Sequence, residues 1–137
     1  MEAKEYLKQL AKISSMIRRK QSEKEQWELI ATGTTAPAGG ERVRSTGTKS
    51  KMSDAIIRAV DIEGEILKLV NRRQEIIKTI EQLEVMEYNV LHMRYVIGMG
   101  FKAIALECGQ KSESWANTVH RKALRNLQKI LDERERR

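Results

Sequence analysis

The sequence predicts an all-α protein in which two long helices form an antiparallel hairpin and a cluster of three shorter helices follows. Apolar residues recur every three or four positions over two long stretches, as they do on one face of a helix. Six of the 137 residues are aromatic (two Trp, three Tyr, one Phe) and one is proline, which is more typical of elongated helices than of a β-sandwich. Glycines divide the last third of the chain into shorter segments.

Residues 3–31 are expected to form the first long helix. Its apolar stripe has the three- and four-residue spacing of an amphipathic helix and includes Leu7, Leu10, Ile13, Met16, Ile17 and Trp27. Lys20 and Lys24 stand where a strict heptad requires apolar residues, so we expect the helix packing to splay there. The stability of this helix must therefore come from packing against another element.

Residues 32–52 are predicted to form a loop, because they contain the only proline and several glycines and lack a sustained apolar period. Four basic residues, set against Glu41, give the segment a net charge of +3: Arg42, Arg44, Lys49 and Lys51. Two interpretations stay open, a solvated linker and an ordered loop that contacts phosphates.

A second long helix is predicted from Ser53, a favourable N-cap residue that Asp54 follows. Its apolar stripe extends to Leu83 at helical spacing. Because this helix is mildly acidic and the first is mildly basic, interhelical ion pairs are expected to favour an antiparallel hairpin over residues 1–85. A coiled-coil dimer is the competing use of the same stripe.

Residues 86–137 are predicted to form a second domain of three helices. Segments 87–96 and 101–107 are each followed by glycines that stop a helix, and Ser112 caps a last helix that reaches about Asp132. A short helix, a turn at Gly109 and a longer helix form the pattern of a DNA-binding helix-turn-helix.

The last helix has an apolar face and a polar face. Its predicted core side consists of Ala116, Val119, Ala123, Leu124, Leu127, Ile130 and Leu131. The opposite face carries short polar residues first and cations farther along, and a recognition helix places such residues against base edges and phosphates, respectively. The predicted base-contacting residues are Glu113, Ser114, Asn117, Thr118 and Arg121, and the predicted phosphate-contacting residues are Lys102, Lys111, Lys122 and Arg125.

Several of these side chains suit particular contacts. Asn117 can form two hydrogen bonds with adenine, and Arg121 can form two with guanine. Glu113 could accept from cytosine or stabilise the positive end of the helix dipole, and we favour the dipole role. Trp115 is expected to pack against the short helix before it, and Cys108 is expected to be a small buried apolar residue.

Residues 83–128 resemble region four of bacterial sigma factors. The matching elements, in order, are Met93-Arg94-Tyr95, Gly98, Lys102-Ala103-Ile104-Ala105, Ser112 and Ala123-Leu124-Arg125-Asn126-Leu127. The resemblance implies base-contacting positions at Glu113, Ser114, Asn117 and Thr118, followed by Arg121 and Lys122. Sigma factors usually carry Arg and Gln where this chain has Asn117 and Thr118, so the expected site differs from a standard −35 element.

Residues 1–131 are similar to the ArpU-like family of phage and prophage transcription regulators. The similarity rests on AKEYLKQL near the start, on STGTKSKMSDAIIRAVDIEGEI, and on Trp115, His120, Ala123 and Leu124. It implies a sequence-specific regulator that activates phage late genes in the cytoplasm of a bacterial host, at the nucleoid. The implied partners are double-stranded DNA and host RNA polymerase, and a homodimer stays open.

Enzymatic and metal-binding roles are not expected. The sequence contains no nucleophile–base–acid set, phosphate-binding glycine loop or metal motif, so no cofactor, metal or small-molecule substrate is predicted. The single Cys108 cannot form an intramolecular disulfide, and His92 and His120 are assigned polar roles in the core or at the surface. No apolar run approaches the length that spans a bilayer, so no membrane partner is predicted.

Two other functions remain open. A coiled-coil interaction or packaging-adaptor protein would bind a protein partner and show no sequence preference on DNA. A sigma-like RNA polymerase subunit would need an aromatic-rich segment to melt a −10 element, and the chain has only six aromatic residues (two Trp, three Tyr, one Phe).

Overall fold

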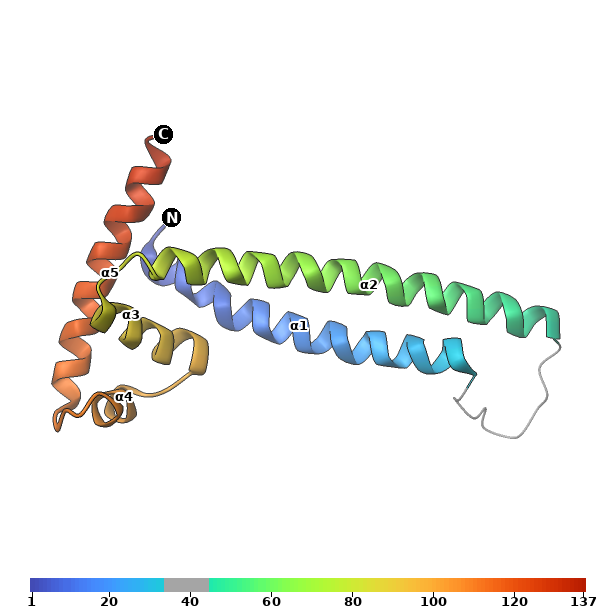
Figure 1. Cartoon of the computed structure of the whole chain (residues 1–137), viewed down its shortest axis with the longest axis horizontal. Coiled ribbons are helices and arrows are strands. Elements are labelled where there is room, and N and C mark those ends of the chain that lie inside the picture. The colour runs from blue at the N-terminus through green and yellow to red at the C-terminus, as the bar shows by residue number, and fades with distance from the viewer. Residues whose placement is uncertain (34–44) are drawn as a thin grey trace. The chain divides into compact units, whose positions relative to one another are not determined.

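The described part of this computed structural model comprises residues 1–33 and 45–137, without the side chains of 45–49. All regular secondary structure in these ranges is helical, which confirms the all-α prediction (Figure 1). The elements are α1 (Ala3–Thr32), α2 (Ser45–Ile80), α3 (Val85–Leu91), the π-helix η1 (His92–Ile97), α4 (Phe101–Glu107) and α5 (Glu113–Glu135). Arg42 and Arg44, which support the interpretation of residues 32–52 as a phosphate-contacting loop, lie outside the described residues.

Helix α2 begins at Ser45, eight residues before the predicted N-cap at Ser53. The predicted loop and cap are therefore wrong over residues 45–53. No proline interrupts this segment, and each residue added to an existing helix gains one hydrogen bond for one residue fixed. Serine and threonine in a helix cost only about 0.5 kcal/mol relative to alanine, so a favourable cap residue does not by itself start a helix.

The remaining boundaries agree more closely with the sequence pattern. Helix α4 occupies the predicted residues 101–107, and α5 starts after Ser112 as predicted. The predicted segment 87–96 is divided between α3 and η1, and Gly98 ends η1 with a φ of 90°. This left-handed backbone conformation favours glycine, because any side chain would be strained there.

The chain forms two compact units, and α1 and α2 each contribute to both. The terminal unit consists of Met1–Ser14 and Arg72–Arg137, and the middle unit consists of Ser15–Asn71. This division differs from the expected boundary between residues 85 and 86. The first turns of α1 bury Ala3, Tyr6 and Leu7 inside the terminal unit, so the N-terminal end of the chain belongs to the same compact unit as the C-terminal helices.

In the middle unit, the segments of α1 and α2 run in opposite directions. Lys20 Nζ donates to Glu65 Oε2 over 3.0 Å, and Arg58 Nη2 donates to Glu23 Oε1 over 3.3 Å. These are interhelical ion pairs of the kind that the charge pattern predicts. Their side chains are partly exposed, so solvent screens each pair and its contribution to stability is small. Burial of Ala55, Ala59 and Ile62 contributes the apolar part of the packing.

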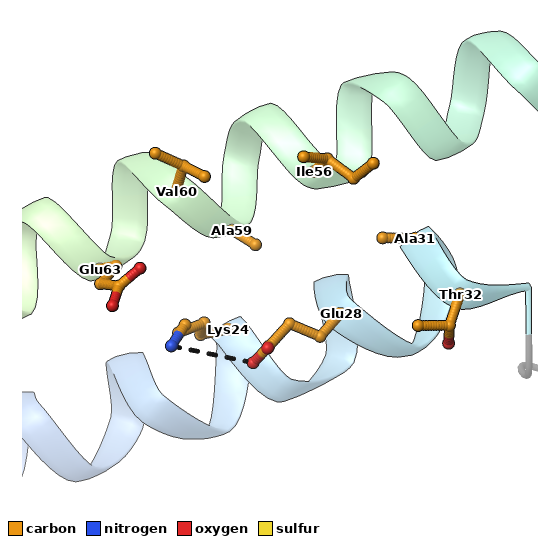
Figure 2. Close-up of a pocket in the computed structure, with 8 residues that line it drawn as sticks. All are labelled: Lys24, Glu28, Ala31, Thr32, Ile56, Ala59, Val60 and Glu63. Atoms are coloured by element: carbon orange, nitrogen blue, oxygen red, sulfur yellow. Dashed lines mark ion pairs between the residues drawn. The ribbon is translucent and has the colours of Figure 1, made fainter.

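A hollow lies between α1 and α2 in the middle unit, where Lys24 interrupts the apolar stripe (Figure 2). Lys24 Nζ lies 3.9 Å from Glu28 Oε1 of its own helix and makes no ion pair with a described residue of α2. The hollow is lined by Lys24, Glu28, Ala31, Thr32, Ile56, Ala59, Val60 and Glu63. The expected splaying near Lys24 is consistent with this hollow, whereas Lys20 is held by Glu65.

In the terminal unit, a buried hydrogen bond joins α1 to α2. Tyr6 Oη lies 3.0 Å from Thr79 Oγ1, and Thr79 Oγ1 donates to the Glu75 carbonyl over 2.8 Å. Because the threonine hydrogen is used there, Tyr6 is the donor to Thr79. The buried apolar side chains around this bond are Leu7, Leu10, Ile76 and Ile80.

The chain's N-terminus binds the C-terminal half of α5. Gln128 forms two hydrogen bonds with it, as acceptor from Ala3 N over 2.7 Å and as donor to the Met1 carbonyl over 3.1 Å. The terminal ammonium of Met1 lies 2.7 Å from Glu135 Oε1. These contacts hold the start of α1 on α5.

A second core holds α3, η1, α4 and α5 together. Its fully buried residues are Val90, Ile104, Ala105 and Ala116. Met93, Met99, Phe101, Cys108, Trp115 and Val119 pack around them. Trp115 and Cys108 thus contribute to packing as expected, although both remain half-buried. This core fixes the orientation of α5 relative to α4.

Candidate nucleic-acid interface

The turn between α4 and α5 closes with two backbone hydrogen bonds. Gln110 N donates to the Ala105 carbonyl over 2.8 Å, and Gly109 N donates to the Leu106 carbonyl over 3.0 Å. With Gly109 at a φ of 75°, this is the Schellman arrangement that ends a helix at a left-handed residue. The turn therefore has a defined geometry, and α5 starts at a fixed distance from the end of α4.

Ser112 caps α5. Its Oγ accepts from Ser114 N over 3.2 Å and lies 2.6 Å from Ser114 Oγ. Glu113 stands in the first turn, where a carboxylate interacts favourably with the helix dipole. One residue turns a helix by about 100°, so Glu113 lies to the side of Ser114. This placement fits the dipole role that we favour for Glu113.

The predicted base-contacting side chains lie on the solvent side of α5. Ser114, Thr118 and Arg121 are exposed, and Asn117 is half-buried. Thr118 Oγ1 donates to the Ser114 carbonyl over 2.9 Å, and Asn117 Nδ2 donates to the Glu113 carbonyl over 3.5 Å. Each of the two side chains uses one donor in this way. The Asn117 oxygen and its second N–H, and the acceptor sites of Thr118, remain available to a ligand.

Cations continue the same face toward the C-terminal end of α5. At about 100° per residue, Ser114, Thr118, Arg121 and Arg125 fall within an arc of about 60°. Lys129, which was not among the predicted contacts, lies about 20° beyond this arc. Its spacing of four residues from Arg125 could have identified it. The polar face is therefore a row of short polar side chains followed by three positive charges.

Most of the predicted phosphate-contacting cations have no ion-pair partner in the described part of the chain. Within residues 1–33 and 45–137, no carboxylate forms an ion pair with Lys102, Lys111 or Arg125, and the same holds for Arg121, a predicted base contact. All four are exposed. Exposed cations without an internal ion pair are available to a polyanion without the cost of breaking such a pair.

Lys122 differs from these four cations, because it is drawn toward α3. Its Nζ lies 4.0 Å from Glu87 Oε2, and the Glu87 side chain is buried. Asn126 Nδ2 donates to both oxygens of this carboxylate, over 2.9 Å and 3.0 Å. Sequence reasoning did not identify Glu87, which is one more acidic residue in a chain with 19. Its carboxylate joins α3 to α5 and partly neutralises Lys122.

His120 lies on the buried face of α5, in a cluster of rings. Its Nε2 is 2.8 Å from Tyr95 Oη, and its ring meets Phe101 edge-on with centroids 5.0 Å apart. The Arg94 guanidinium lies 4.3 Å from the Phe101 centroid and donates to the Met99 carbonyl over 3.2 Å. The cluster therefore links η1, α4 and α5. His120 falls on the apolar stripe four residues after Ala116, and that spacing could have placed it here.

Burial decides the charge state of this cluster. It lowers the pKa of His120, and the positive charges of Arg94 and Lys4 lower that pKa further. Burial also raises the pKa of Tyr95. Near neutral pH the phenol is therefore protonated and the imidazole uncharged, which suits donation from Tyr95 to His120. His120 contributes no positive charge to the surface of α5.

Other chemistry has little support among the described residues. Residues 1–33 and 45–137 contain no group of three or more His, Cys, Asp or Glu side chains arranged to hold a metal ion. Burial, and then the charge of Glu107, raise the pKa of Cys108, which disfavours its reactive thiolate. In the same ranges, no helix is apolar over a length sufficient to cross a bilayer.

Comparison of the chain with protein-family models, curated proteins and solved structures found no match.

Proposed function

We propose that this protein is a sequence-specific DNA-binding regulator of transcription that inserts α5 into the major groove. The observation that carries the proposal is the polar face of α5. On it the exposed Ser114 and Thr118 and the half-buried Asn117 precede the unpaired cations Arg121 and Arg125. A recognition helix needs this order, because its N-terminal residues meet base edges while cations nearby meet phosphates.

The helix-turn-helix interpretation of α4 and α5 is supported by two features. The Schellman turn at Gly109 and the cap at Ser112 limit the ways in which α5 can leave α4. The apolar core around Ile104 and Ala116 then holds the two helices together. A helix held on this scaffold can present its polar face without a change in its own packing.

The individual roles follow from side-chain chemistry. Asn117 and Arg121 are proposed to contact adenine and guanine, each pair contributing about 1–3 kcal/mol of discrimination. Ser114 and Thr118 supply further contacts to bases, and Glu113 stabilises the start of the helix. Lys102, Lys111 and Arg125 contact phosphates, and Lys122 contributes less because Glu87 holds it.

The biological setting is proposed from the resemblance to ArpU-like regulators and to sigma region four. In this setting the protein binds the DNA of a bacterial host, activates phage late genes and can contact RNA polymerase. A role without catalysis or cofactor is part of the same proposal.

The test is selection of binding sites from a random duplex library with the full chain. We expect a short enriched sequence that the Asn117→Ala/Arg121→Ala variant no longer selects. The matched control, Lys8→Ala/Lys78→Ala, removes two exposed cations from α1 and α2 and should select the wild-type site. Weak, salt-sensitive binding by the wild type without enrichment would contradict the proposal and favour a protein-interaction function.

A further inference from the structure

Helix α2 carries a second apolar face in the middle unit, beside the face that packs on α1. Two of its residues, Ile56 and Val60, also line the edge of the hollow between the two helices. Ala55, Ala59 and Ile62 bury the first face, whereas Ile57 and Val60 remain 58% and 60% exposed. Ile56 and Leu67 are exposed to a similar degree, at 53% and 59%. In Figure 2, Ala59 points toward α1 and Val60 points away from it. A single exposed apolar side chain is ordinary, but four on one face mark an interaction surface.

The exposed face has the spacing of a coiled-coil seam. Its positions alternate in steps of four and three residues: Ser53, Ile57, Val60, Gly64, Leu67 and Asn71. All six are exposed. We call these six residues the α2 seam. Its apolar positions lie in the middle and its polar positions at the two ends.

The α2 seam is complementary to itself when reversed. In an antiparallel pair centred on Ile62, Ile57 faces Leu67 of the second copy, and Val60 faces Gly64 of the second copy. Ser53 and Asn71, which can hydrogen-bond with each other, meet at the ends. Each layer thus pairs two large apolar side chains, a large apolar side chain with a glycine, or two polar side chains. The arrangement obeys the two-fold symmetry of an isologous dimer.

Gly64 is otherwise hard to explain. Glycine is one of the least favourable residues inside a helix, and a Cβ placed on Gly64 would meet nothing within 4 Å in the chain itself. Nothing inside one copy therefore requires glycine at this position. In the antiparallel pair the missing side chain makes room for Val60 of the second copy.

The flanks of the seam add a charge match. In an antiparallel pair, the residues on one side of the seam face the residues on the same side of the seam in the second copy. Asp54 of each copy therefore meets Lys68 of the other, which gives two such pairs. On the other flank, Ile56 meets Val70 of the second copy. Asp61 and Glu63 each approach their own counterpart near the two-fold axis, and because both are exposed this repulsion is weak in water.

We propose that a second copy of this chain binds the α2 seam in antiparallel orientation, with Val60 of each copy over Gly64 of the other. The proposal goes beyond DNA binding and does not rest on it, since every residue of the seam lies in the middle unit. A parallel pair would set Gly64 against Gly64 and leave a gap in the seam.

The first test is sedimentation equilibrium of the full chain without DNA. The wild type should be a dimer, and Ile57→Asp/Leu67→Asp should raise the dissociation constant at least about a hundredfold. The control Val85→Asp/Ile97→Asp changes two apolar residues of the terminal unit that are at least as exposed as Ile57 and Leu67, and this variant should remain a dimer. A monomeric wild type, or a seam variant that dimerises as tightly as the wild type, would overturn the proposal.

Crosslinking tests the orientation. In a Cys108→Ser background, Ser53→Cys/Asn71→Cys should give a covalent dimer under mild oxidation, because these positions lie about 27 Å apart within one helix and can meet only between copies. Efficient crosslinking of Val60→Cys to itself, without crosslinking of the first variant, would show a parallel pair and overturn the proposed orientation.

A Gly64→Leu variant separates dimerisation from helix stability. Leucine favours the helix more than glycine does, yet it fills the space proposed for Val60 of the second copy. We therefore expect weaker dimerisation together with undiminished helicity by circular dichroism. Dimerisation as tight as that of the wild type would contradict the close approach at Gly64.

Discussion

Glu87 Oε1 accepts a hydrogen bond from Asn126 Nδ2 over 2.9 Å, which joins a buried carboxylate of α3 to the middle of α5. The same carboxylate lies 4.0 Å from Lys122 Nζ. The Glu87 side chain thus positions α5 and also lowers the positive charge on the surface of α5. Placement and charge of the proposed DNA-binding helix are coupled through Glu87.

Neutralising Glu87 is expected to strengthen DNA binding. In Glu87→Gln, an amide oxygen can still accept from Asn126, but Lys122 loses its counter-charge and becomes available to a phosphate. The slope of the logarithm of the DNA association constant against the logarithm of the salt concentration should become more negative by about 0.9, the value for one added phosphate contact. Fluorescence anisotropy across a salt series measures this slope.

The control for this change is Glu84→Gln, which neutralises an exposed carboxylate just before α3 that makes no ion pair within the described ranges. It should leave the slope near the wild-type value. A Glu87→Gln slope equal to that of this control would show that Lys122 does not reach the DNA even when it is released.

Stability should depend on pH through His120. Burial, Arg94 and Lys4 lower its pKa in the folded state, so below about pH 6.5 the unfolded chain binds a proton that the folded chain does not. The free energy of unfolding should therefore fall as the pH drops below about 6.5, and level off below the pKa of the folded state.

His120→Gln removes this component, since glutamine does not titrate and can still accept from Tyr95. Urea unfolding between about pH 7.5 and 5.5 should show a smaller decrease for the variant than for the wild type. The same decrease in both proteins would mean that other groups cause it.

The left-handed turn at Gly109 should be sensitive to substitution. Gly109→Ala places a Cβ at a φ of 75° and should lower the free energy of unfolding by about 1 kcal/mol or more. Gly109→Asn should cost less, because asparagine tolerates this conformation better than alanine does. Urea denaturation of both variants provides the comparison, and an equal cost would argue against backbone strain as the cause.

The Tyr6–Thr79 hydrogen bond should stabilise the terminal unit. Tyr6→Phe removes the donor and should lower the free energy of unfolding by about 1 kcal/mol. A double-mutant cycle with Thr79→Val isolates the interaction of the two hydroxyl groups. A coupling free energy near zero would show that the 3.0 Å contact does not contribute to stability.

Local signals predicted the bounds of the C-terminal helices, whereas the two compact units depend on contacts between residues far apart in the chain. Gly98, Gly109 and Ser112 act on adjacent residues, so the bounds of α4 and the start of α5 follow from the sequence. The bond between Ala3 and Gln128 joins residues 125 positions apart, and no local pattern announces it. Contacts of this kind, together with the Tyr6–Thr79 hydrogen bond, hold the first turns of α1 in the terminal unit.

The candidate site could be predicted only in part. The polar face of α5 follows from its helical period, and its exposed residues are the predicted ones apart from the half-buried Asn117. The restraint of Lys122 by Glu87 depends on how α3 packs against α5, which no spacing encodes. At Ser53 the sequence pattern was misleading, because a strong cap residue also fits inside a helix that started earlier.

The most direct test of DNA sequence recognition by α5 is the ratio of affinities for the selected site and a scrambled duplex at one salt concentration. The wild type should prefer its site by about a thousandfold or more. Asn117→Ala/Arg121→Ala should reduce this ratio at least about thirtyfold, while Lys8→Ala/Lys78→Ala leaves it unchanged. An unchanged ratio in the Asn117→Ala/Arg121→Ala protein would contradict base recognition by α5.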